Sequence, residues 1–217
     1  IAMQLLAAGF NAFVLRYSVK PSVFPVALLE AAEAVRRMRA HAAEWHVDGD
    51  RIAVIGFSAG GHLAANLATS VSDDVLAAHG YDPDEVRPNG LMLSYPVITS
   101  GPLAHRGSFD ALLGEKKDDQ KALDAVSIEK HIDAKTPPVF VWHTLPDGCV
   151  PYENTLMLVD ACKKAGVSIE AHLFPEGGHG LALGNAETAW QGVNGIEPCV
   201  QAWPKLAIDW MRRTFAK

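Results

Sequence analysis

Short apolar runs alternate with helical patterns along most of this chain, and this alternation constrains the fold more than any other feature of the sequence. Each run is short enough for a buried strand. When buried strands alternate with helices, the strands pair in parallel and the helices cover both faces of the sheet. The sequence therefore predicts an α/β fold, a three-layer α/β/α sandwich around a mostly parallel sheet. The predicted strands are NAFVLRY (11–17), RIAVIGF (51–57), GLMLSYPV (90–97), PPVFVWHT (137–144) and SIEAHLF (168–174).

Helical patterns fill the spaces between these strands. Apolar residues recur at three- and four-residue steps from Val26 to Trp45, so we expect one amphipathic helix that Pro25 opens. Another helix is expected over 153–165, because it is followed by Gly166 and glycine readily adopts the left-handed conformation that ends helices. Further helices are expected over 1–8, 60–70 and 203–211.

The length and composition fit a single domain over residues 1–217. A chain of 217 residues, 49% of them hydrophobic, can bury one sizeable core without a second domain. Residues 98–136, between the predicted strands at 90–97 and 137–144, are rich in charge and turn residues. We therefore treat this segment as an insertion within the one domain.

Charge and the length of the apolar runs argue against several classes of partner. The formal net charge is -6 and the charges are interspersed, so we expect no nucleic-acid or membrane partner and a small-molecule substrate. No apolar run approaches the roughly 18 residues of a membrane span. No basic and then apolar leader opens the sequence. A cytoplasmic protein is the expectation.

The cysteines predict neither a disulfide framework nor a metal site. Cys149, Cys162 and Cys199 are odd in number and lack CxxC spacing, so we interpret them as isolated packed thiols. His41 and His46 stand five residues apart on one predicted helix, which does not place two metal ligands on the same face. Solvated surface is the better interpretation, and we expect no metal and no cofactor.

Residues suited to nucleophilic catalysis follow several of the predicted strands. Ser58, Asp147 and His179 each lie in a loop after a strand, and in open α/β sheets such loops build the site. A serine hydroxyl is a weak nucleophile at neutral pH, so it needs an imidazole to take its proton and a carboxylate to orient that imidazole. We therefore predict Ser58 as nucleophile, His179 as base and Asp147 as acid.

The stretch GFSAG (56–60) adds a second prediction. Gly56 and Gly60 permit a sharp strand-to-helix turn that holds Ser58 outward, and the N–H of Ala59 then points towards a developing oxyanion. Ala59 is the predicted oxyanion-hole donor. Taken singly, GFSAG and the Pro-Asp-Gly turn around Asp147 also suit ordinary turns. The combination of the serine, aspartate and histidine loops in this order favours catalysis.

Other titratable residues near these loops have structural interpretations that we prefer. His62 lies one turn along the helix after the predicted nucleophile, where packing or capping suits it better than the role of base. His143 stands inside an apolar strand and is interpreted as a core or loop-bracing histidine. Glu153 and Asp160 lie on the next helix, displaced from the strand end that carries the predicted acid.

These motifs resemble a known family. GFSAGGHLA, TPPVFVWHTLPDGCVPYENT and FPEGGHGLAL resemble the α/β-hydrolase esterases related to acetyl xylan esterases, a group of esterase and lipase-like carbohydrate esterases. FNAFVLRYSV and GSFDALLG extend the resemblance over the chain. GxSxG is shared by all α/β hydrolases, and the segments around Asp147 and His179 are more specific. The resemblance implies a serine carboxylesterase that deacetylates sugar or xylo-oligosaccharide esters, with 98–136 as a cap-like insertion bordering the pocket.

One departure from the family leaves alternatives open. Family members precede the helix at 1–8 with extra strands and a glycine-rich loop that supplies a second oxyanion N–H, so an N-terminally truncated fold is expected here. Losing one such donor costs about 3 kcal/mol of transition-state stabilisation, and missing strands expose a sheet edge. A longer parent protein, a homo-oligomer that covers this edge, and a local rearrangement are the alternatives.

Two rival functions follow from the same residues. One is a serine peptidase of the prolyl-oligopeptidase type, which shares the triad order but usually carries a large gating domain. The other is a non-catalytic relic that lacks the oxyanion loop. Acyl esters tested beside peptide amides separate the first rival, and labelling of Ser58 by a serine-directed phosphonate separates the second.

Overall fold

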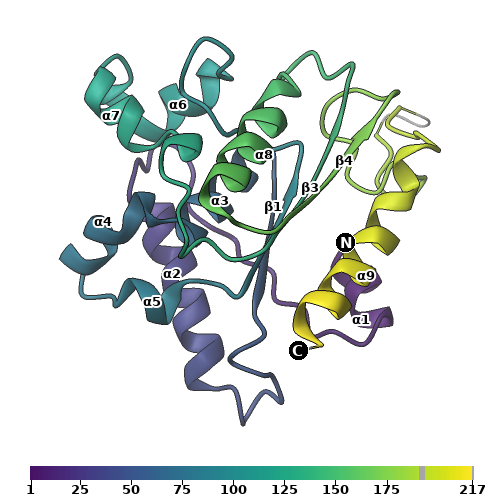
Figure 1. Ribbon diagram of the computed structural model, residues 1–217, viewed down its shortest axis with the longest axis horizontal. Coiled ribbons are helices and arrows are strands. Elements are labelled where there is room, and N and C mark those ends of the chain that lie inside the picture. The colour runs from purple at the N-terminus through teal and green to yellow at the C-terminus, as the bar shows by residue number, and fades with distance from the viewer. Residues whose placement is uncertain (191–193, 217) are drawn as a thin grey trace.

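A parallel sheet forms the centre of the structure, a computed structural model that describes residues 1–190 and 194–216. Each strand pairs in parallel with the next strand in sequence, giving the order β1-β2-β3-β4. Helices connect the strands, as crossovers between parallel strands require. The predicted α/β fold is confirmed (Figure 1). The strands are β1 (Ala53–Phe57), β2 (Gly90–Ser94), β3 (Val139–Thr144) and β4 (Ile169–Phe174).

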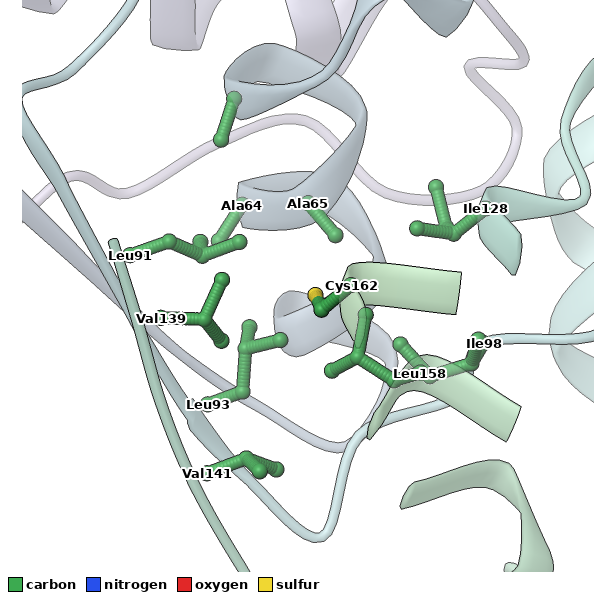
Figure 2. Packing of buried hydrophobic residues seen from close by; sticks show 11 residues of the cluster. Ala64, Ala65, Leu91, Leu93, Ile98, Ile128, Val139, Val141, Leu158 and Cys162 are labelled. Atoms are coloured by element: carbon green, nitrogen blue, oxygen red, sulfur yellow. The ribbon is translucent and has the colours of Figure 1, made fainter. Parts of the chain in front are cut away.

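One face of the sheet packs against α3 (Ala59–Ala68) and α8 (Glu153–Ala165), with α2 (Val26–Ala40) packed beside α3. Successive side chains of a strand point to opposite faces, so alternate residues of β2 and β3 reach this layer. Figure 2 shows these side chains meeting those of the two helices in one apolar cluster. Its labelled members are Ala64, Ala65, Leu91, Leu93, Ile98, Ile128, Val139, Val141, Leu158 and Cys162.

The opposite face packs against α9 (Trp203–Phe215) and α1 (Ala2–Ala7). Met92, Phe140 and Trp142 are the alternate strand residues that point this way. The indole of Trp142 stacks on that of Trp203, with ring centroids 5.4 Å apart. Figure 1 shows α1 and α9 on one side of the sheet and α2, α3 and α8 on the other. The predicted three-layer sandwich is confirmed.

Short helices fill the connections. Within 98–136, the side chains of Phe109, Leu113, Leu123 and Val126 form a small buried cluster with Val150 and Val97, so this segment is packed against the sheet's carboxyl edge. The α-helices of the connections are α4 (Asp73–Ala78), α5 (Pro83–Val86), α6 (Arg106–Leu113) and α7 (Gln120–Ala125). The 3-10 turns are η1 (Ser70–Ser72), η2 (Gly114–Lys116), η3 (Ile128–Lys130) and η4 (Val200–Ala202).

Residues 11–17 form no strand in the structure, so the prediction of a buried strand there is wrong. Val14 is 77% exposed and Phe13 is 51% exposed. Within the described residues, no backbone hydrogen bond joins this segment to a strand, and the Asn11 side chain donates to the carbonyl of His46 instead. A strand needs a neighbour that pairs with its backbone N–H and C=O groups. The apolar pattern by itself does not supply that neighbour.

Several boundaries differ from the predicted ones. The helix expected to run to Trp45 ends at Ala40, and Trp45 lies in the turns that follow, where its ring stacks on His41. The strand expected over 90–97 ends at Ser94, because Tyr95 has a φ of 38°, outside the extended region. The helix expected over 153–165 is confirmed, and Gly166 ends it in the left-handed conformation.

The cysteines are unpaired, but they are not all packed. Cys162 is buried between α8 and the sheet, as interpreted, whereas Cys149 is exposed and Cys199 is partly exposed. The interpretation of Cys149 as a packed thiol is therefore wrong, because it lies at the surface of a loop. In the part of the chain that the structure describes, the helices are too short or too polar to cross a bilayer.

Candidate active site

Ser58 stands at the sharp turn between β1 and α3. Its φ of 53° and ψ of -121° are strained for a residue with a side chain. The turn depends on a glycine: a Cβ on Gly56 would lie 2.2 Å from the carbonyl oxygen of Gly60. Backbone bonds hold the turn, because the Ser58 N–H donates to the Ser94 carbonyl at 3.0 Å and its carbonyl accepts from the Val97 N–H at 3.2 Å. The hydroxyl is thus held at the end of the strand.

The structure brings the side chains of Ser58, His179 and Asp147 into one hydrogen-bonded row. The Ser58 hydroxyl donates to Nε2 of His179 at 2.7 Å, and Nδ1–H of His179 donates to Oδ2 of Asp147 at 2.7 Å. Asp147 follows β3 and His179 follows β4. The carboxyl ends of parallel strands meet at one edge of the sheet, which is why residues so far apart in sequence lie together.

Asp147 is held as a buried carboxylate. Its side chain is fully buried, and burial alone would raise its pKa. Hydrogen bonds from His143 and His179 and from the backbone N–H groups of Val150 and Cys149 outweigh that effect and hold the pKa of Asp147 well below its usual range. The two backbone donors reach Oδ1 at 2.9 Å and 2.8 Å. The carboxylate therefore stays charged at neutral pH and fixes the orientation of the imidazole.

The glycine-rich loop that carries His179 is held by the end of β3. The hydroxyl of Thr144 donates to the carbonyl of Gly178 at 3.1 Å. Gly177 has a φ of 101°, which favours glycine, and a Cβ there would lie 2.7 Å from a methyl of Leu181. The loop is therefore fixed by packing and by a hydrogen bond, and the imidazole of His179 is presented at a defined position.

Ala59, the predicted oxyanion donor, is the first residue of α3. The N–H groups of a first helical turn have no carbonyl one turn earlier to bond, and the helix dipole is positive at this end. Ala59 also lines a cavity of about 150 Å³ with mostly apolar walls. Both the segment after residue 17 and helix α6 contribute to these walls. Its other lining residues include Tyr17, Phe24, Leu28, Leu63, Phe109 and Leu112.

Tyr95 contacts the row of side chains and was missed by the sequence reasoning. Its ring meets that of His179 edge to face, with centroids 4.9 Å apart, and its hydroxyl accepts from the Ala182 N–H at 3.1 Å. Burial raises the pKa of Tyr95 to about 12. No clear signal for this contact was present in the sequence, because the strand predicted over 90–97 places Tyr95 inside the strand, whereas β2 ends at Ser94.

His62 and His143 have the structural contacts that the sequence suggested. The Nε2–H of His62 donates to the Val126 carbonyl at 2.7 Å, and burial lowers the pKa of His62 to about 4. Its side chain therefore ties α3 to the end of α7. His143 is fully buried and reaches Asp147 and Thr155.

The remaining candidates lie away from the row. Asp160 pairs with Lys164 on the exposed side of α8, at 2.5 Å. Glu153 is the first residue of that helix and is not among the hydrogen-bond partners of Asp147. His41 pairs with Glu44 at 2.9 Å on the surface. The preference for Asp147 over the acids of α8 agrees with this geometry.

One cluster in the described residues has a spacing that could hold a metal ion. The ligand atoms of Glu176, Glu197 and Cys199 lie within 4.8 Å of one another. Cys199 already donates from Sγ to the backbone carbonyl of Glu176 at 3.7 Å, and Glu176 is exposed. The hydrogen-bonded row of Ser58, His179 and Asp147 uses none of these groups.

The chain is similar to several curated proteins. A curated relative named endo-1,4-beta-xylanase B, from Butyrivibrio fibrisolvens, is 36% identical over 88% of this chain and 31% of its own length. A second, named acetylxylan esterase, from Xylanibacter ruminicola, is 28% identical over 81% of this chain and 35% of its own length. The chain thus spans about a third of the length of these curated relatives.

Solved structures extend this likeness to the fold. The crystal structure of an acetyl ester-xyloside bifunctional hydrolase from Caldicellulosiruptor lactoaceticus superposes with a TM-score of 0.82 at 40% identity, covering 98% of this chain and 74% of that one. A profile of the BD-FAE family matches residues 1–162. The strand order, the turn at Ser58 and these similarities agree. The chain belongs to the BD-FAE family and has the α/β-hydrolase fold.

Proposed function

We propose that the protein is a serine carboxylesterase that hydrolyses small acyl esters, with Ser58 as nucleophile, His179 as base and Asp147 as the orienting acid. The observation that carries the proposal is the continuous row of hydrogen bonds, 2.7 Å from Ser58 to His179 and 2.7 Å from His179 to Asp147. Membership of a family whose relatives include named ester hydrolases supports the reaction class.

In the first half of the reaction the Ser58 oxygen attacks the ester carbonyl. His179 takes the hydroxyl proton at Nε2, which already accepts that hydrogen bond. The resulting imidazolium is stabilised by the buried negative charge of Asp147 at Nδ1. The N–H of Ala59 faces the negative oxygen of the tetrahedral intermediate, and His179 then gives its proton to the departing alcohol.

In the second half a water molecule attacks the acyl-enzyme. His179 removes a proton from the water at Nε2 and returns it to the Ser58 oxygen as the acid product leaves. The same hydrogen-bonded row serves both halves, because each half needs one proton to be taken and given at the same nitrogen. Nothing in this sequence of steps requires Asp147 to become protonated.

The substrate we propose is an acetyl ester of a sugar or xylo-oligosaccharide. The names of two relatives, acetylxylan esterase and acetyl ester-xyloside bifunctional hydrolase, support this class. The cavity beside Ala59 is small, about 150 Å³, which suits a short acyl group. Segment 98–136 contributes Ser108 and Phe109 to its wall, in keeping with the proposed pocket-bordering insertion.

The test compares ester hydrolysis by the chain and by Ser58→Ala. With p-nitrophenyl acetate and an acetylated xylo-oligosaccharide, we expect Ser58→Ala to lose at least about a thousandfold in kcat. Ser168→Ala is the matched control, because Ser168 is an exposed serine just before β4. Equal rates for Ser58→Ala and the parent chain would refute the proposal. Faster cleavage of short peptide amides than of esters would favour a peptidase.

A further inference from the structure

His143 lies one residue before the end of β3, with its side chain fully buried beside Asp147. Its Nε2 is 3.2 Å from Oδ2 of Asp147 and 3.0 Å from the carbonyl oxygen of Val150. Its Nδ1 is 2.9 Å from the hydroxyl of Thr155 on α8. Both ring nitrogens therefore have partners inside the protein, and the ring joins the strand, the loop of the acid and a helix.

These partners determine where the proton of His143 lies. Nε2 faces two acceptors, a carboxylate and a carbonyl, so it must carry the hydrogen and share it between them. Nδ1 faces a hydroxyl, which can donate to the nitrogen lone pair. A neutral imidazole protonated at Nε2, with Thr155 donating to Nδ1, satisfies each contact. Because that lone pair accepts a hydrogen bond, the N–H on the other side becomes a stronger donor.

Oδ2 of Asp147 consequently accepts from two histidines. One is Nδ1–H of His179 at 2.7 Å, and the other is Nε2–H of His143 at 3.2 Å. We propose that His143 is a positioning residue that shares this oxygen with His179 and thereby sets how strongly Asp147 holds the proton of His179. This rests on the proposed function, in which His179 is the base.

The second hydrogen bond at Oδ2 of Asp147 is expected to lower the affinity of His179 for its proton. A second donor at Oδ2 spreads the negative charge of the carboxylate over two hydrogen bonds, so less of it stabilises the imidazolium of His179. His143 therefore keeps the base from binding its proton too tightly. Without this donor, Oδ2 of Asp147 accepts a hydrogen bond from His179 alone. The protonated form of His179 then persists to higher pH.

Several other titratable groups lie around His179 and Asp147 in the described part of the chain. Glu197 lines one cleft with His179, and Glu176 lies on the same loop as His179; both carboxylates are unchanged in every variant compared below. Cys149, on the same loop as Asp147, is largely exposed. Slight desolvation of its thiol and the nearby charge of Asp147 raise the pKa of Cys149, so the thiol is neutral at neutral pH. Tyr95, packed on His179 from the end of β2, is neutral because burial raises its pKa to about 12. His143 is thus the group whose replacement changes the donors to Asp147 without adding charge.

The experiment uses two amides of different length. In His143→Gln the side-chain nitrogen falls near Nε2 of the histidine, so it can still donate to Asp147. In His143→Asn the amide falls near Nδ1, so it meets Thr155 and leaves Asp147 without this donor. The protonation midpoint of His179, followed by 15N NMR of the imidazole, and the acidic limb of the kcat/KM profile are measured for both variants.

We expect His143→Asn to raise both midpoints by about half a pH unit and therefore to lower kcat/KM at neutral pH by up to about threefold, because less His179 is then free to act as base. His143→Gln is expected to restore the midpoints of the parent chain. Equal midpoints in the two variants, or a downward shift in His143→Asn, would overturn the proposal, since a merely structural histidine would lower activity without moving the midpoints.

A second pair keeps the test decisive if the His143 variants do not fold. Thr155→Val removes the hydroxyl that polarises the ring, and Thr155→Ser keeps it, so only Thr155→Val should raise the midpoint, by a smaller amount. An unchanged midpoint in Thr155→Val would count against the proposal. A parent chain without esterase activity would refute the proposed function alone, because the NMR midpoints still decide the role of His143.

Discussion

The carboxyl edge of the sheet and the segment at 11–17 have similar local sequence signals but different structures. Both contain apolar runs that predict strands. At the carboxyl edge, β1 to β4 pair along their lengths and carry Ser58, Asp147 and His179 into contact. The segment at 11–17 has no strand pairing among the described residues, and Val14 is 77% exposed. The difference teaches that an apolar run becomes a strand only where a neighbour completes its backbone hydrogen bonds.

The largest effect is expected when a large side chain is removed from the paired strands. Trp142→Ala in β3 takes out a fully buried indole that stacks on Trp203. We expect the free energy of unfolding to fall by about 3–5 kcal/mol, measured by urea denaturation. A loss no larger than that of a surface substitution would show that the paired region isn't the stabilising part.

Replacing Gly56 tests whether the geometry of Ser58 depends on the close approach of β1 and α3 at the turn. Gly56→Ala would place a Cβ 2.2 Å from the Gly60 carbonyl oxygen. We expect a cost of about 3 kcal/mol in the free energy of unfolding, together with loss of esterase activity. Gly107→Ala in α6 is the matched control, because its Cβ would make an ordinary contact at 3.4 Å with the His105 ring. Normal activity in Gly56→Ala would contradict the strained turn.

The buried His62 of α3 makes the free energy of unfolding depend on pH. Burial lowers the pKa of His62 to about 4, from 6.5. Since the unfolded chain binds a proton at higher pH than the folded one, stability falls on acidification across that window. When the pH falls from about 6 to about 5, we expect the free energy of unfolding to fall by about 1 kcal/mol. This decrease should be absent in His62→Gln. His79→Gln, at an exposed histidine, should behave like the parent chain.

The smallest effect is expected in the unpaired segment. Val14→Ser removes an apolar side chain that is 77% exposed. The free energy of unfolding should change by less than about 0.5 kcal/mol. A loss of more than about 2 kcal/mol would mean that residues 11–17 pack against something in solution. That outcome would favour the sequence expectation of a covered edge, as in a homo-oligomer.

Much of the fold was predictable because the spacing and the length of the apolar runs distinguish strands from helices. The strands at 51–57, 90–97, 137–144 and 168–174 were predicted with shifts only at their ends, since buried parallel strands have long apolar runs and glycine or proline nearby. The helix end at Gly166 was predictable because glycine readily adopts the left-handed conformation that ends helices, and Gly166 does so in the structure. Whether 11–17 would pair was not, because pairing depends on residues far away in sequence.

The site was predictable in its main residues but not in their support. That Ser58, Asp147 and His179 lie together was predictable, because each follows a strand of a parallel sheet and such loops meet at one edge. The contacts of Tyr95 with His179, and of His143 with Oδ2 of Asp147, depend on distances across the fold. His143 looked like any apolar-strand histidine, and only its two acceptors distinguish it. The positioning role of His143 and the catalytic roles of Ser58, His179 and Asp147 stay predictions.

Covalent labelling tests most directly whether His179 activates the hydroxyl of Ser58. Incubation of the chain with a fluorophosphonate, followed by peptide mass spectrometry, should give one adduct, on the peptide that carries Ser58, and His179→Ala should slow its formation by at least about a hundredfold. An unlabelled Ser58, or labelling at equal rates in the parent chain and His179→Ala, would show that the imidazole does not activate this hydroxyl.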